Sequence, residues 1–251
     1  MTTRRLALPI GIAALAGACL LGLQLGQSAG WVQHGARPPW LPVLRWGALF
    51  VLSWTLMTGV MMVPTALPFL RAAERLAGGI AIVGTGVGFT LAWALVGMAI
   101  WSALWLSAPL TVAAWPGQME LIAGIMLLLA ALYQLSPLAK TCQQACAQPF
   151  GILARHWHGR STLIESLTAG LDYGMRCVGC CVPMIILMLL VGMSDVLWIL
   201  ALTAVMSVLK HPKHGARLRL PIAALLASGG IAIATGIWRL PLHPLRVLCA
   251  V

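Results

Sequence analysis

The segment "CVGCCVPMIILMLLVGM", from Cys177 to Met193, places three of the chain's seven cysteines at the start of an apolar run. A helix that crosses a bilayer needs roughly 20 predominantly apolar residues, and this run approaches that length. We therefore predict that the segment is a transmembrane helix with sulfur ligands at one end.

The composition is that of an integral membrane protein. Of the 251 residues, 61% are hydrophobic and only 8% are charged, whereas soluble domains are about 25% charged. A net charge of +11 can indicate a nucleic-acid partner, but here the basic residues lie between apolar runs and form no polar face. This distribution is typical of charges that orient a membrane protein, so we expect a lipid bilayer and no nucleic acid as a partner.

Residues 1–251 are predicted to form a single all-α domain, a polytopic bundle of about seven transmembrane helices. The predicted spans are Leu6–Gly26, Leu44–Leu67, Ala77–Leu106, Met119–Ser136, Cys177–Met193, Asp195–Leu209 and Pro221–Trp238. The segment from Pro137 to Thr162 is predicted to be a cytoplasmic loop. Residues 163–176 either lie at the membrane interface or extend the fifth span.

The basic residues predict an N-terminus inside the cell. With this orientation, eleven Lys and Arg residues lie on the inner side and four on the outer side, as the positive-inside rule favours. The inner residues are Arg4, Arg5, Arg71, Arg75, Lys140, Arg155, Arg160, Lys210, Lys213, Arg217 and Arg219. The outer residues are Arg37, Arg45, Arg239 and Arg246, and Arg176 begins a span.

The fifth span carries a one-sided row of sulfur. Positions i, i+4, i+7 and i+11 share one face of a helix, and these positions are taken by Cys177, Cys181, Met184 and Met188. Cys180 lies beside this face, and Pro183 can loosen the helix there. Thiolates and thioethers without a carboxylate suit Cu(I) best, and zinc second. The alternative is that these residues are ordinary apolar packing.

Two further groups of sulfur ligands lie elsewhere in the chain. The second span contains Met57, Met61 and Met62, and Met206 lies at a similar depth on the sixth span. Cys142 and Cys146 are one helical turn apart in the segment after Pro137. With the predicted topology, all of these groups meet in the cytoplasmic half of the bundle. Cys19 and Cys249 stand alone and are expected to be inert.

Ionisable residues other than Lys and Arg are few. Asp172 precedes Cys177 by five positions, and an ionisable group near membrane depth suggests a function, so we predict that it supports the metal ligands. His156 and His158 alternate with basic or aromatic residues and are predicted to be solvated. The chain has no Ser-His-Asp arrangement, phosphate loop or HExxH motif, so it lacks the parts of a hydrolase, an ATP-driven pump or a zinc protease.

The stretches "WTLMTGVMMVPTALP", "YQLSPLAKTCQQACAQP" and "GLDYGMRCVGCCVPMIILM" together resemble a bacterial family of integral membrane proteins described as metal-binding and, in some members, as copper chaperones. The resemblance covers most of residues 44–215, and its most specific part is the Cys-x-x-Cys-Cys block. It implies a helical protein of the inner membrane that handles a soft metal. By position it points to Cys142, Cys146, Cys177, Cys180, Cys181, Met57, Met61, Met62 and Met184.

The chain departs from the family pattern at three places. Members usually have His where this chain has Tyr173, and Trp after the paired cysteines where it has Val182 and Pro183. Many members end the next helix with Glu-Lys, where this chain has Leu209 and Lys210. If the absent His or Glu contributes to a metal site in relatives, the site in this chain is altered.

From these observations we predict a non-enzymatic protein that binds and relays Cu(I) through its Cys/Met row. Its partners would be the metal ion and a cytoplasmic or membrane protein that accepts it, with Cys142 and Cys146 donating or accepting the ion at the cytoplasmic face. One alternative is a membrane thiol-disulfide oxidoreductase that uses Cys177 and Cys180 as its redox couple. The other is an accessory membrane subunit whose sulfur is packing.

Overall fold

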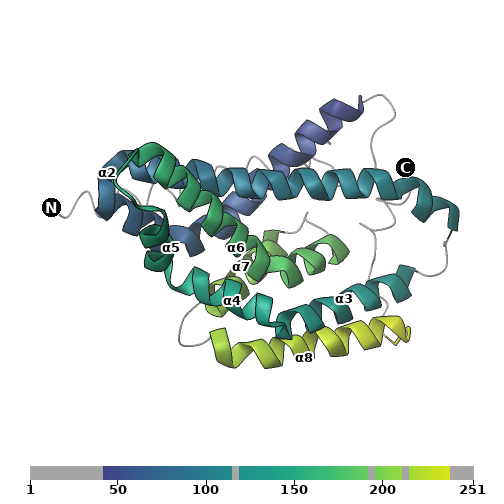
Figure 1. Cartoon of the computed structure of the whole chain (residues 1–251). Coiled ribbons are helices and arrows are strands. Elements are labelled where there is room, and N and C mark those ends of the chain that lie inside the picture. The colour runs from purple at the N-terminus through teal and green to yellow at the C-terminus, as the bar shows by residue number, and fades with distance from the viewer. Residues whose placement is uncertain (1–41, 115–118, 192–195, 211–214, 238–251) are drawn as a thin grey trace.

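The computed structural model describes residues 42–114, 119–191, 196–210 and 215–237, and within them the protein is all-α, as predicted. The helices are α2 (Val43–Ala114), α3 (Met119–Leu135), α4 (Pro137–Ala147), α5 (Pro149–His156), α6 (Thr162–Val191), α7 (Val196–Leu209) and α8 (Gly215–Ala234). In Figure 1, α6 and α7 lie between α2 on one side and the paired helices α3 and α8 on the other. The predicted first span, Leu6–Gly26, lies outside the described residues.

Helix α2 is two helices joined by a sharp turn, and it covers both the second and the third predicted spans. Helical geometry fails at Ala77 (φ −147°) and Gly78 (φ 74°), and a positive φ is readily adopted only by glycine. The chain reverses direction there, so that Gly47 packs against the Trp101 side chain and Gly97 packs against the Trp54 side chain. The two arms, residues 43–77 and 79–114, therefore pack antiparallel.

Small residues set the closest helix packing. Gly88 of α2 lies so near the α6 backbone that an added Cβ would be 2.1 Å from Leu167 O, and a Cβ at Gly170 of α6 would be 2.3 Å from Thr85 O. On the other side of the bundle, a Cβ at Gly124 of α3 would be 2.6 Å from Gly230 O of α8. Such contacts between small residues are the usual way in which membrane helices approach closely. The contacts at Gly88 and Gly170 hold α6, which carries the cysteines, against α2.

The predicted loop from Pro137 to Thr162 is wrong in part, because it folds into α4 and α5. Ser136 caps α4 by accepting a hydrogen bond from Ala139 N, and Pro137 occupies the first turn, where its missing N–H costs nothing. The chain bends by 62° between α3 and α4. Arg219 of α8 donates to the carbonyls of Gln134 and Ser136 at this bend. The bend turns α4 back toward α6.

Among the residues that the structure describes, three helices are long and apolar enough to cross a membrane: Val43–Leu106, Thr162–Leu190 and Gly215–Ala234. The bent pair α3 and α4 would add a fourth, and α7 is shorter. Helix α6 begins at Thr162 and not at Cys177, so the second of the two alternatives for residues 163–176 is confirmed. As a result, the cysteines lie near the middle of a 30-residue helix.

Candidate metal centre

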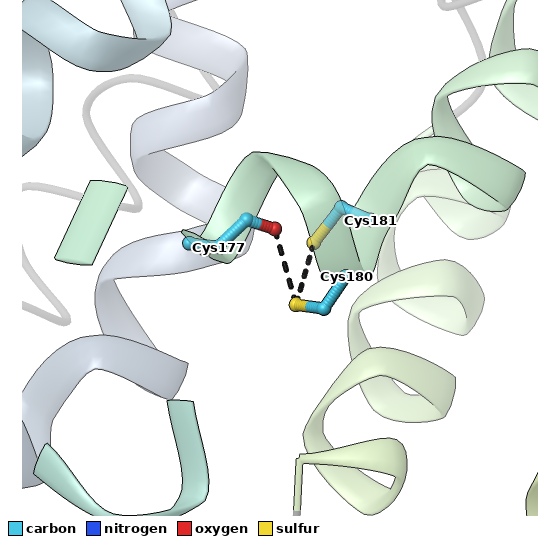
Figure 2. Close-up of side chains that lie close together, drawn as sticks. All are labelled: Cys177, Cys180 and Cys181. Carbon is cyan, nitrogen blue, oxygen red and sulfur yellow. Dashed lines mark hydrogen bonds between the residues drawn. The ribbon is translucent and has the colours of Figure 1, made fainter. Parts of the chain in front are cut away.

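Helix α6 turns its three cysteines toward the same buried point. The side chains of Cys177, Cys180 and Cys181 are at most 2% exposed, and their three Sγ atoms lie within 4.8 Å of one another. The Cys180 thiol lies 3.1 Å from Cys177 O and 3.7 Å from Cys181 Sγ, and Figure 2 shows both contacts as dashed lines that meet at the Cys180 sulfur. The Cys-x-x-Cys-Cys spacing therefore produces a compact group of three thiols. Helical spacing alone predicts that Cys180 lies beside the face formed by Cys177 and Cys181. In the structure, Cys180 belongs to the same group of thiols.

Helix α4 adds a fourth thiol. Cys146 Sγ lies 3.8 Å from Cys180 Sγ, and Cys146 is itself buried. Cys142, one turn earlier, is only partly buried. Its Sγ would be 2.6 Å from a Cβ added at Gly179, so α4 and α6 touch where α6 has no side chain. The prediction that Cys142 and Cys146 converge on the α6 cysteines agrees with this geometry.

Two thioethers complete the group. Met62 of α2 places its Sδ 3.8 Å from Cys181 Sγ and 4.0 Å from Cys177 Sγ. Met206 of α7 places its Sδ 3.7 Å from Cys181 Sγ. We call Met62, Cys146, Cys177, Cys180, Cys181 and Met206 the sulfur cluster. It draws on four helices that are far apart in the sequence.

The spacing of the sulfur cluster fits a shared soft ion. Thiolates that bind one metal at about 2.3 Å lie roughly 3.8 Å apart in a tetrahedral site and roughly 4.0 Å apart in a trigonal site. Five sulfur pairs of the cluster are 3.7–4.0 Å apart, and the three Sγ atoms of α6 all lie within 4.8 Å of one another. No carboxylate or imidazole of the described residues belongs to the group of possible ligands. A donor set of sulfur alone selects soft ions such as Cu(I), and Zn(II) second.

The backbone of α6 is supported from α3 at the cluster. Pro183 has no N–H, so it cannot donate to the carbonyl of Gly179 four residues earlier. The hydroxyl of Tyr133 donates to that carbonyl at 2.8 Å. The bond fixes the turn of α6 between Cys177 and Cys181. The sequence signals only half of this arrangement, because Pro183 reveals the free carbonyl but not its partner.

Lys210 also contacts the sulfur cluster, which the sequence alone does not reveal. It follows directly after α7 and is only 7% exposed. Its Nζ lies 3.0 Å from Cys177 Sγ, 3.5 Å from Met62 Sδ and 2.9 Å from Thr65 Oγ1. Lys210 is four positions after Met206, which places both on one face of the helical turn. That spacing is a signal in the sequence, where Lys210 enters as a topological charge and as part of the family resemblance but not as a neighbour of the cysteines.

Asp172 points to other partners. Its two oxygens bind His156 Nε2 at 3.2 Å and Arg176 Nε at 2.8 Å, and all three side chains are partly exposed. These contacts tie α5 to α6 one turn before the cysteines. His156, predicted to be solvated, is thus a partner of Asp172 at this junction. If Asp172 influences metal binding, it would do so indirectly, through its ion pairs with His156 and Arg176.

The remaining predicted ligands line the apolar core around the cluster. They are Met57, Met61, Met184 and Met188, each at most 4% exposed. Tyr173, which stands where relatives have His, stacks on Phe69 with ring centroids 4.1 Å apart and planes 3° apart. An aromatic pair therefore occupies this position in the described structure.

Comparison with known proteins supports the same chemistry. Residues 51–233 match the PpoB2 family, which is described as a copper chaperone family. The match covers most of the chain and all of the sulfur cluster, so the chain belongs to this family, as the resemblance implied. A chaperone binds and transfers its ion without catalysing a reaction, so family membership also confirms that the chain is not an enzyme. No curated protein and no solved structure matches the chain.

Proposed function

Starting from membership of the copper chaperone family, we propose that the chain binds one Cu(I) ion in the sulfur cluster and passes it to a protein partner. The observation that carries this proposal is the convergence of six sulfur atoms from four helices, with five of their pairs 3.7–4.0 Å apart. Packing alone does not require four free thiols to meet at one point. Cu(I) is the common ion that an all-sulfur donor set prefers.

The exposures of the cysteines support a direction for exchange. Cys142 is partly buried, Cys146 is 7% exposed, and Cys177 and Cys181 are fully buried. An ion arriving at Cys142 could therefore move to Cys146 and Cys180, and then inward by exchange of neighbouring sulfur ligands. Met184 and Met188 extend the face of α6 beyond the cysteines, and as weaker thioether ligands they suit onward transfer better than storage.

We further propose that the protein is a multi-pass protein of the inner membrane with its N-terminus inside. The two arms of α2, the bent pair α3–α4, and helices α6, α7 and α8 would then provide the second to seventh predicted spans. Contacts place the sulfur cluster at the level where α3 and α7 end, because Tyr133 reaches Gly179 and Lys210 reaches Cys177. This level would be the cytoplasmic end of the shorter spans, where a soluble partner can approach.

The alternative of a thiol-disulfide oxidoreductase has one observation in its favour, since Cys146 Sγ and Cys180 Sγ are 3.8 Å apart. A redox couple, however, needs accessible thiols of low pKa and an electron acceptor. Both of these cysteines are buried, and the surrounding thioethers have no part in disulfide exchange. The geometry thus favours metal binding.

The test is to load purified protein in detergent with Cu(I) under anaerobic conditions, remove excess metal, and measure copper per chain. We expect about one ion, lost when Cys177, Cys180 and Cys181 are all replaced by Ser. The matched control is the variant Cys19→Ser/Cys249→Ser, which should retain the ion. Unchanged stoichiometry in the triple variant would remove the proposal. A stable disulfide in the triple-cysteine block, with no bound copper, would favour the oxidoreductase.

A further inference from the structure

The sulfur cluster contains a positive charge as well as sulfur. Lys210 Nζ touches Cys177 Sγ and Met62 Sδ, two members of the cluster, and its third contact is the neutral hydroxyl of Thr65. A cation-binding site that holds a cation of its own is unexpected, because the ammonium repels the ion to be bound. This arrangement needs a physical reason.

The ammonium has no carboxylate partner in the described structure. Both ion pairs found among the described residues involve Asp172, with His156 and Arg176 as the partners. A buried charge is costly unless it is paired. The groups that can supply the opposite charge to Lys210 are therefore the thiolates of the cluster, and Cys177 is the nearest at 3.0 Å.

The charges of the ammonium, the thiolates and the bound ion can be summed for a monovalent and for a divalent ion. Two thiolates, one monovalent ion and one ammonium sum to zero, whereas a divalent ion in the same place leaves a net positive charge in a buried site. With three thiolates the same sums are −1 for the monovalent ion and zero for the divalent ion, so neutrality favours Cu(I) only in a site with two thiolates. Whatever the number of thiolates, the ammonium repels a divalent ion twice as strongly as a monovalent ion at the same distance.

We propose that Lys210 is a specificity-determining residue whose buried ammonium makes the sulfur cluster select monovalent Cu(I) over divalent soft ions such as Zn(II). This inference rests on the proposed function, because it concerns the ion held by the same cluster. Sulfur ligands alone accept both ions. The charge of Lys210 adds a discrimination that the ligand types do not provide.

The test compares affinities for Cu(I) and Zn(II), each measured by competition with a chromophoric chelator, in the full-length protein and in Lys210→Gln, which removes the charge without adding a sulfur ligand. We expect the ratio of Cu(I) to Zn(II) affinity to fall by at least about tenfold in Lys210→Gln. Lys210→Arg keeps the charge and should keep most of the selectivity. Lys140→Gln, at an exposed lysine of α4, is the matched control and should leave the ratio unchanged.

The ratio of Cu(I) to Zn(II) affinity separates a charge effect from a loss of structure, because a general loosening of the cluster would weaken the binding of both ions. Lys210→Leu provides a second neutral variant if Lys210→Gln does not fold. An unchanged ratio in a folded neutral variant, or an equal loss of selectivity in Lys210→Arg, would overturn the assignment. If the unmodified protein binds neither ion, the proposed function itself fails, and the two failures are thereby distinguished.

Discussion

The hydroxyl of Tyr133 on α3 donates a 2.8 Å hydrogen bond to the carbonyl of Gly179 on α6, between Cys177 and Cys180 of the sulfur cluster. That carbonyl is free because Pro183 lacks the N–H that would pair with it in a regular helix. The proline and the tyrosine therefore act together. Pro183 removes one backbone hydrogen bond of α6, and Tyr133 replaces it with a hydrogen bond from a neighbouring helix. This relationship holds the cysteine turn in a fixed position.

Tyr133→Phe should destabilise the protein by about 1–2 kcal/mol, because the Gly179 carbonyl loses its donor while remaining partly buried. Thermal unfolding in detergent, followed by circular dichroism, measures the effect. The matched control is Tyr173→Phe, since the described structure gives the Tyr173 hydroxyl no partner and the stacking on Phe69 survives the change. Equal melting temperatures for the two variants would show that the bond does not stabilise the fold.

Single replacement of Cys177, Cys180 or Cys181 by Ser should weaken Cu(I) binding to a similar degree. Helical spacing predicts that Cys180 matters least, but its Sγ lies 3.8 Å from Cys146 and 3.7 Å from Cys181, so it occupies the middle of the group. Competition with a Cu(I) chelator gives the three affinities. A much smaller loss for Cys180→Ser would instead support the one-sided row as the binding unit.

Met62→Leu should reduce Cu(I) affinity, whereas Met57→Leu should not. Both residues are buried on the first arm of α2, and the Met→Leu change nearly conserves volume. They differ in that the Met62 thioether contacts Cys177 and Cys181. The two affinities are measured in the same assay as the cysteine variants. Equal affinities in both variants would mean that Met62 serves only as packing.

Met184→Leu should leave the copper stoichiometry intact and slow transfer to a partner or across a vesicle membrane. The reason is that a thioether contributes little to holding the ion but provides the next position in ligand exchange. Bound copper and transfer rate are measured on the same preparation. An unchanged rate would identify the methionine face of α6 as packing, and the protein would then be a cysteine-based metal holder.

Reporter fusions after Arg75, Arg160 and Lys213 should all give cytoplasmic signals. Arg75 lies just before the turn of α2, and Arg160 lies just before α6. The second arm of α2 runs parallel to α6, since Gly84 meets Ser166 and Gly88 meets Leu167, so both positions lie at the same end of the bundle. A periplasmic signal at Arg160 would place Cys142 and Cys146 in an oxidising compartment and strengthen the oxidoreductase alternative.

The sequence determined the all-α fold class and identified the cysteine block of the candidate metal centre. Low charge and long apolar runs predict helices, which satisfy their own backbone hydrogen bonds, and the helices from residue 43 onward follow most of the predicted spans. The Cys-x-x-Cys-Cys block predicted a soft-metal site because side-chain spacing along one helix depends only on the helical repeat. Cys142 and Cys146 were likewise identified from their spacing, although their segment was expected to be a loop.

Only the tertiary structure decided which residues from other helices meet that block. Met57, Met61 and Met62 are equivalent in sequence, but the packing of α2 against α6 brings the Met62 sulfur to Cys177 and Cys181. Tyr133, Met206 and Lys210 reach the cluster from helices whose register depends on interhelical packing. Such contacts depend on where small residues such as Gly88 and Gly170 allow backbones to approach. Local periodicity carries no information about that approach, so the charge inside the site became visible only in the folded chain.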